Sequence, residues 1–289
     1  MGSQIVEKIA DIYPQLYLDP DRVGIERYKD VMLKGDKQEA TDLSWYIGDP
    51  RDKLEILNTP AGDILALTFY VRSDFEYFLR SMMAAKDGPE NKIPASQGAS
   101  MLRTFNWQKI RKHMTDFYNE QKLAGNMDPD WDAEWVKFTS VKSNYMDFIV
   151  VLSTGPYSAV SAERMGLPEA EWKELSGIIR KYHEITHVIC QTKYPDQVNV
   201  VWDELVADAI GIYAAFGSFD PEKERIFLGL QGDQYTGGRL GNYTDDPQGI
   251  AAKVNAALAG IDRIISEHSV DDPFSLIDFL QESQKELYG

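Results

Sequence analysis

Residues 181–187 read KYHEITH and place two of the chain's four histidines four positions apart. They lie within residues 168–192, where an initial proline, early glutamates and apolar periodicity predict one long helix. Residues four apart on a helix share a face, with Cβ atoms about 6 Å apart. His183 and His187 can therefore direct ring nitrogens at one ion, at about 2.0–2.1 Å for zinc. The fold must then bring a further ligand to this face.

The alternative is a structural helix in which two histidines occur together by chance, a risk that this short motif always carries. The flanking residues argue against a solvated face, because several sides of the helix are apolar: Ile178, Ile179, Ile185, Val188 and Ile189. Imidazoles in such surroundings are costly to leave unpaired. We therefore favour a metal site, in which Glu184 does not bind the ion but acts as general base toward a zinc-activated water.

A third ligand is predicted on the next helix, residues 202–217. Glu204 follows His187 by 17 residues, which is enough for a helix end, a loop and a returning helix. Asp208 lies one turn later on the same face and can accept the second ring N–H of a ligating histidine. Two acids on a helix can also mark a solvated face, but most neighbours of these two are apolar: Trp202, Leu205, Val206, Ala207, Ala209 and Ile210.

An HExxH helix followed by a helix with E-x-x-x-D resembles the gluzincin metallopeptidases, the thermolysin-like group. In that family both histidines and the later glutamate bind zinc, the motif glutamate is the general base, and the aspartate supports a ligand. The resemblance implies Zn²⁺ bound by His183, His187 and Glu204, with Glu184 as base and Asp208 as support. It also implies a zincin-like fold and a peptide or small amide substrate.

Three short motifs, YHEITH, DELVAD and GRLGNY, are also similar to an uncharacterised bacterial HExxH family. That resemblance implies fold and metal but no substrate. Gluzincins usually carry a later histidine or tyrosine that stabilises the oxyanion. Candidates in the Gly-rich segment 232–247 are Arg239, Tyr243 and Tyr235. The alternatives are a structural tie for Arg239 and simple packing for the tyrosines. His268, near the end of a predicted surface helix, is a less favoured candidate.

The other segments predict an α+β chain with a mixed sheet, active-site helices and a mostly helical C-terminal half. We expect an N-terminal α/β portion at residues 1–95 and a metal-binding portion at 96–289, or one continuous domain. The remaining elements expected are strands at 53–57, 64–71 and 145–153, a linker at 87–100, and helices at 104–122, 249–267 and 273–287. The strand at 145–153 is either an edge strand that pairs with substrate, as in zincins, or a buried core strand.

The composition of the chain argues against several classes of binding partner. A net charge of −16 argues against nucleic acid and anionic lipid. No apolar run is long enough to span a membrane, and the first residues do not resemble a secretory signal. The single cysteine, Cys190, rules out an internal disulfide, so we expect a cytoplasmic protein. The sequence does not indicate whether the chain forms oligomers.

The function expected from the sequence is zinc-dependent hydrolysis of a peptide or amide bond. The alternatives are a zinc enzyme acting on a non-peptide or modified-peptide substrate, and a zinc-stabilised binding protein without catalysis.

Overall fold

The computed structural model describes residues 3–36, 42–87, 92–268 and 270–289. The fold is α+β with a small mixed sheet and about 57% helix, which confirms the expected class. The chain divides into two compact units, Met1–Ile56 with Leu65–Val151 and Leu57–Ile64 with Leu152–Gly289. The expected boundary at 95/96 lies inside the first unit, because that unit continues from Leu65 to Val151.

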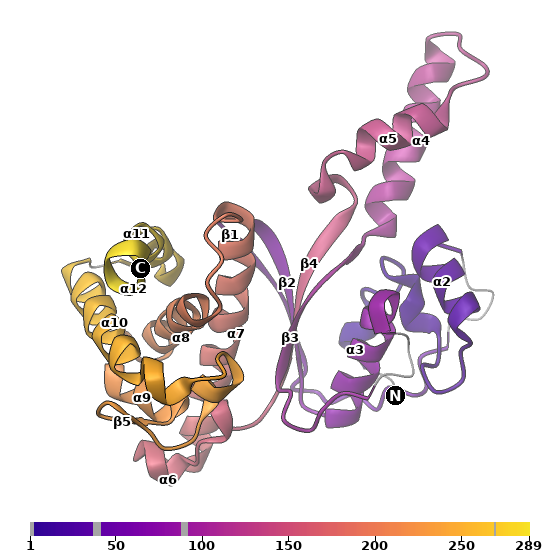
Figure 1. Cartoon of the computed structure of the whole chain (residues 1–289). Coiled ribbons are helices and arrows are strands. Elements are labelled where there is room, and N and C mark those ends of the chain that lie inside the picture. Colours follow the sequence, from indigo (N-terminus) through magenta and orange to yellow (C-terminus); the bar gives the residue numbers. More distant parts are fainter. Residues whose placement is uncertain (1–2, 37–41, 88–91, 269) are drawn as a thin grey trace. The chain divides into compact units, whose positions relative to one another are not determined.

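One four-stranded sheet has the order β1-β2-β4-β3 (Figure 1). Its strands are β1 (Lys53–Thr59), β2 (Gly62–Phe69), β3 (Ala99–Phe105) and β4 (Met146–Ser153). The predicted β1–β2 turn is present: the Thr59 hydroxyl donates to the carbonyl of Gly62 at 2.7 Å, and Gly62 takes a φ of 98°. Such a left-handed conformation favours glycine.

β4 lies between β2 and β3, so of the two alternatives for the strand at 145–153 the edge strand is wrong and the core strand is confirmed. Its last five residues are all buried, and the continuous apolar run is that of a core strand. β3 was not predicted. It occupies the end of the expected linker at 87–100 and the start of the expected helix at 104–122. Residues 88–91 of that linker lie outside the described residues.

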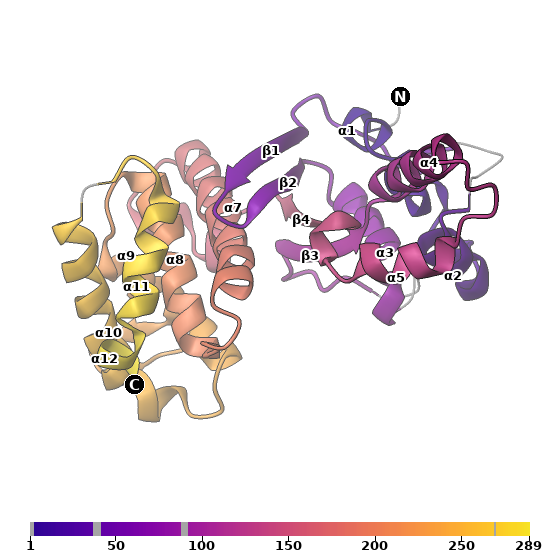
Figure 2. The ribbon, with the colours of Figure 1, turned by 90° about the horizontal axis from the view of Figure 1, so that it is seen from above.

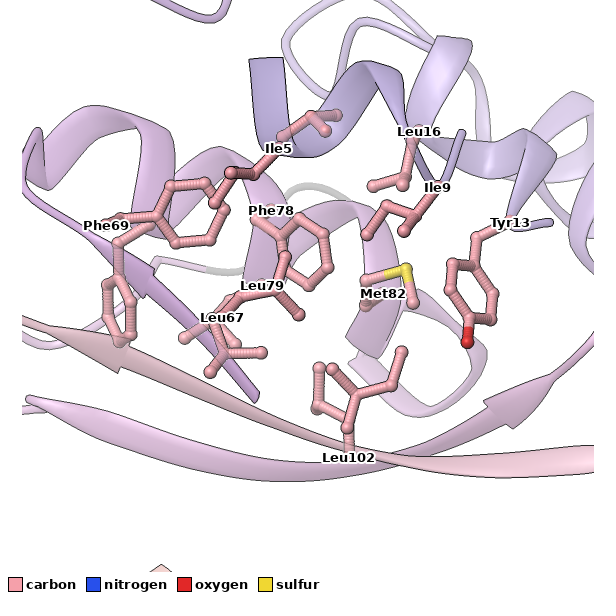
Figure 3. Packing of buried hydrophobic residues seen from close by; sticks show 14 of the residues in the cluster. Ile5, Ile9, Tyr13, Leu16, Leu67, Phe69, Phe78, Leu79, Met82 and Leu102 are labelled. Atoms are coloured by element: carbon pink, nitrogen blue, oxygen red, sulfur yellow. The ribbon is translucent and has the colours of Figure 1, made fainter. Parts of the chain in front are cut away.

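The core of the first unit packs on one face of this sheet (Figure 3). Strand residues Leu67, Phe69 and Leu102 meet Phe78, Leu79 and Met82 of helix α3. The N-terminal segment adds Ile5, Ile9, Tyr13 and Leu16 to the same cluster. The elements concerned are α1 (Gln4–Glu7), η1 (Pro14–Tyr17) and α3 (Arg72–Asp87), and α2 (Ile25–Lys34) packs beside them.

A helical hairpin joins β3 to β4 (Figure 1). It consists of α4 (Trp107–Leu123) and α5 (Trp131–Thr139), followed by the short η2 (Lys142–Asn144). The Asn106 side chain accepts from the Lys109 amide and so caps α4, which begins three residues later than expected. His113 of α4 stacks on Phe138 and lies 2.9 Å from Glu134, so it is a structural histidine.

The second unit is dominated by helices (Figures 1 and 2). Its longest are α7 (Glu169–Lys193), α8 (Val200–Phe216) and α10 (Pro247–Glu267), in agreement with the predicted segments. The remainder are η3 (Tyr157–Ala159), α6 (Ala162–Met165), α9 (Pro221–Leu228), β5 (Leu230–Gln231), β6 (Gln234–Tyr235), η4 (Arg239–Asn242), η5 (Pro273–Ser275), α11 (Leu276–Glu282) and α12 (Gln284–Tyr288).

α7 and α8 pack closely because of Gly211. A Cβ atom there would lie 2.7 Å from the carbonyl oxygen of Ile179 on α7. The glycine therefore sets the spacing between the two helices that carry the predicted ligands. Among the described residues, no helix combines the length and apolar character needed to cross a membrane.

Candidate metal centre

Helices α7 and α8 bring His183, His187 and Glu204 together. One ligand atom from each lies within 4.8 Å of the other two. The Nε2 atoms of the two histidines are 3.0 Å apart. The two Glu204 carboxylate oxygens each lie 3.5 Å from one of these nitrogens, Oε2 from that of His183 and Oε1 from that of His187.

These separations fit a tetrahedral ion. Ligands about 2.0–2.1 Å from such an ion lie about 3.3 Å from one another. The nitrogens are 3.0 Å apart, and each lies 3.5 Å from its nearest Glu204 oxygen, which is a different oxygen for each histidine, so these separations lie near that value. Two imidazoles and one carboxylate are also a donor set that zinc accepts. The three residues could therefore hold a metal ion, and zinc stays a prediction.

Asp208 hydrogen-bonds a candidate ligand, as expected. The Nδ1–H of His183 donates to its Oδ1 at 2.8 Å, which leaves Nε2 for an ion. Burial disfavours the His183 imidazolium, but this hydrogen bond and the charges of Asp208 and Glu204 outweigh it, so the pKa of His183 is raised. For Asp208 itself burial is outweighed by the charge of Arg239 and the bond from His183, so its pKa is far below the usual range.

His187 is held neutral. Burial, reinforced by the charge of His183, lowers its pKa to about 3. A neutral imidazole offers the lone pair that a metal requires. The side chain of His187 is 18% exposed and that of Glu204 17%, against 7% for His183. The group therefore keeps some access to solvent on the side of His187 and Glu204.

Arg239 reaches the centre from the Gly-rich segment. Its Nη2 donates to Oδ2 of Asp208, and its Nη1 donates to the Tyr157 hydroxyl at 2.6 Å. That hydroxyl donates to Oδ1 of Asp208 at 2.6 Å. Arg239 is thus the structural tie considered as an alternative. Its buried Nε–H has no hydrogen-bond partner within the described part of the chain.

Glu184 lies beside the ligands without joining them. Burial raises its pKa, as does the charge of Glu204, whereas His183 and Arg180 lower it. A carboxyl group with a raised pKa exchanges protons more readily near neutral pH. The role of Glu184 as general base stays a prediction.

The candidate tyrosines differ. Tyr243 interacts with Glu204, its ring lies 5.9 Å from the Arg239 guanidinium, and burial raises its pKa. The hydroxyl of Tyr235 is used within its own loop, where it donates to the Gly238 carbonyl and accepts from the Gly238 amide. Tyr243 is therefore the better placed of the two.

Two other singled-out residues have structural roles. His268 donates from Nδ1 to the Ile264 carbonyl and stacks on Phe279. Cys190 is buried, and its thiol accepts from the Gln281 amide at 3.2 Å.

A family model described as a family of unknown function (DUF7005) matches residues 20–269. The chain belongs to this family. The match includes every residue of the centre described above, and the family description assigns no activity. No match was found among curated proteins or among solved structures.

In this DUF7005 member, sequence reasoning assigned no role at the centre to Tyr157, Arg180 or Glu224. Arg180 donates to three backbone carbonyls at the end of β4 and just after it, those of Ser153, Gly155 and Pro156. Its position one turn before His183, on a partly apolar helix, was a signal that could have been used.

Glu224 gave no such signal, because its segment PEKER reads as an exposed helix start. It is fully buried, and neither carboxylate oxygen has a hydrogen-bond partner among the described residues. Burial raises its pKa well above the usual value, and the nearby charge of Asp208 acts in the same direction. Glu224 therefore holds its proton in the folded chain.

Proposed function

We propose that this chain is a zinc-dependent hydrolase of zincin type, a metallopeptidase cleaving peptide or small amide bonds. The observation that carries the proposal is the convergence of His183, His187 and Glu204 from two packed helices. The nitrogen and oxygen separations of 3.0 and 3.5 Å suit one small ion. Asp208 supports it by fixing the tautomer of His183.

Partial exposure favours a catalytic site over a structural one. Structural zinc sites are closed by four protein ligands, whereas catalytic sites keep a position open. Here three protein ligands converge, and His187 and Glu204 retain 18% and 17% exposure. A solvent molecule or a substrate atom can complete the coordination from that side.

Charge balance favours a divalent cation. Four carboxyl groups surround the centre, those of Glu184, Glu204, Asp208 and Glu224, against the two guanidinium groups of Arg180 and Arg239. With Glu224 protonated, the other three carboxylates exceed the two guanidinium groups by one negative charge. The mutual repulsion contributes, after burial, to the raised pKa values of Glu184 and Glu224. A divalent ion removes that excess.

The residues of the chain divide the work of hydrolysis. Bound zinc would polarise the scissile carbonyl and acidify water. Glu184 accepts a proton from the attacking water and passes it to the leaving amine, a task suited to its raised pKa. Tyr243 and the unpartnered Nε–H of Arg239 are donors for negative charge that develops on the carbonyl oxygen.

Elemental mass spectrometry tests the proposal directly. Wild-type protein purified without chelator or nickel should contain about one zinc per chain, and His187→Ala should contain far less. His113→Ala is the matched control, because His113 pairs with Glu134 and stacks on Phe138. The same samples are then assayed on a peptide library. Wild-type protein without metal, even after incubation with zinc, would overturn the proposed function.

A further inference from the structure

The hydroxyl of Tyr157 contacts the candidate ligand His183 and two further residues, Asp208 and Arg239. Its hydroxyl lies 3.0 Å from Nδ1 of His183, donates to Oδ1 of Asp208 at 2.6 Å, and accepts from Nη1 of Arg239 at 2.6 Å. These partners come from α7, α8 and η4, which are distant in sequence. One oxygen atom is therefore the common neighbour of a candidate ligand, its carboxylate support and the arginine.

We propose that Tyr157 is a positioning residue of this centre, whose hydroxyl aligns His183 and Arg239 through their shared partner Asp208. The inference rests on the proposed function, since it assigns Tyr157 a task at the same metal site. It adds a residue that the HExxH pattern and the later glutamate do not include.

The protonation states suit this role. Burial raises the pKa of Tyr157 well above its usual value, although the charge of Arg239 acts in the opposite direction. The phenol is therefore neutral and keeps its O–H. It can donate to the ionised Asp208 while its oxygen accepts from Arg239, so both of these contacts have a donor and an acceptor.

The ring of Tyr157 is held on several sides. It meets Phe227 edge-on with centroids 5.1 Å apart, and the guanidinium groups of Arg239 and Arg180 lie 4.8 and 5.8 Å from its centroid. Tyr157 is 4% exposed. A Tyr157→Phe substitution therefore removes the hydroxyl and leaves the packing of the ring in place.

Helix α7 also fixes the backbone around Tyr157. Ser176 Oγ accepts from the Tyr157 amide at 2.9 Å, and the Trp172 indole donates to the Val160 carbonyl at 2.8 Å. Between these anchors, Ser158 and Ala159 adopt positive φ angles of 52° and 56°. Consecutive non-glycine residues in this conformation persist only where the surroundings impose it. The fold thus holds Tyr157 in place at a conformational cost.

The test combines cobalt binding with thermal stability. Tyr157→Phe should bind Co²⁺ about tenfold more weakly than wild type, the lower end of the effect for residues that orient a ligand. Its visible Co²⁺ spectrum should also shift, which a merely structural change elsewhere does not cause. Tyr213→Phe is the control, because it removes a hydroxyl on α8 that donates to the Val270 carbonyl at 3.2 Å.

A double-mutant cycle on chelator-treated protein gives a readout that needs no metal. Tyr157→Phe and Arg239→Lys should lower Tm together by less than the sum of their separate effects, because both break the same contact. Additive losses would overturn the shared network.

The two proposals fail in distinguishable ways. Wild-type protein that binds no Co²⁺ would overturn the metal site and, with it, any ligand positioning by Tyr157. Wild-type protein that binds Co²⁺ while Tyr157→Phe keeps both affinity and spectrum would overturn the role of Tyr157 alone.

Discussion

Nδ1 of His183 and Oδ1 of Asp208 face each other at 2.8 Å between helices α7 and α8. The contact joins residues 25 positions apart and turns Nε2 of His183 toward His187 and Glu204. It also ties the candidate ligand to Arg239, which donates to the other oxygen of Asp208. The orientation of His183 thus depends on a single carboxylate that is fully buried.

Replacing Asp208 by Asn should therefore weaken metal binding and the fold together. Loss of a residue that orients a histidine ligand lowers metal affinity by about 10–100-fold. Removing one partner of a buried ion pair costs about 3–5 kcal/mol, here because Arg239 keeps its charge. Chelator competition and thermal denaturation measure the two effects. Asp271→Asn, at an exposed position, should change neither. Wild-type affinity in Asp208→Asn would contradict this account of His183.

Glu184→Gln should separate metal binding from catalysis. The amide retains the size of the side chain but cannot accept a proton, so hydrolysis should fall by about 10²–10⁴-fold. Zinc content should stay at the wild-type level, because Glu184 is not one of the three converging ligands. Glu174→Gln, at an exposed position on the same helix, is the control for activity. Full activity of Glu184→Gln on a substrate that wild type cleaves would exclude Glu184 as the base.

Local sequence patterns were sufficient for the helices of the centre. Helical spacing predicted α7 and α8, and it placed His183, His187, Glu204 and Asp208 where the structure brings them together. Each of these inferences used residues one helical turn apart, or two consecutive helices joined by a short loop. Local spacing carries such information because it fixes which side chains share a face.

Contacts between distant segments were beyond the same reasoning. Tyr157 meets Arg239 across 82 residues, and nothing in the sequence around either one indicates the other. β3 was not predicted because it directly follows a polar segment that reads as a linker. The interior position of β4 depends on the order of the strands in the sheet, which the sequence does not give. A continuous apolar run is compatible with more than one place in a sheet, so the sequence left both possibilities open.

Gly211→Ala should disturb the centre without touching it. The added Cβ would lie 2.7 Å from the Ile179 carbonyl oxygen and 3.0 Å from its Cγ2 atom, so α7 and α8 must separate. Such overpacking costs about 1–3 kcal/mol. Separation also moves Glu204 away from the histidines, so zinc affinity should fall. Denaturant unfolding and chelator competition measure both quantities.

Gly177→Ala is the matched control for this prediction. Gly177 lies within α7, and no atom beyond its chain neighbours and the adjacent backbone of its own helix lies within 4 Å of the position that its Cβ would take. Alanine there should stabilise the helix by about 0.5–1 kcal/mol and leave zinc affinity unchanged. Two variants of the same chemistry should therefore have opposite effects on stability. An equal effect of both would show that the spacing of the two helices does not depend on Gly211.

Glu224→Gln should change how stability depends on pH. Burial and the charge of Asp208 raise the pKa of Glu224, so the folded chain keeps a proton that the unfolded chain releases above about pH 4.3. The stabilisation from this proton is complete below that pH and is lost as pH rises toward the folded pKa, by about 1.4 kcal/mol per pH unit. An amide has no such proton. The Tm of Glu224→Gln relative to wild type should therefore increase from acidic to alkaline pH in chelator-treated protein. Glu222→Gln on the same helix, where the side chain is 75% exposed, should show no comparable trend. A pH-independent difference between Glu224→Gln and wild type would mean that Glu224 is already ionised in the fold.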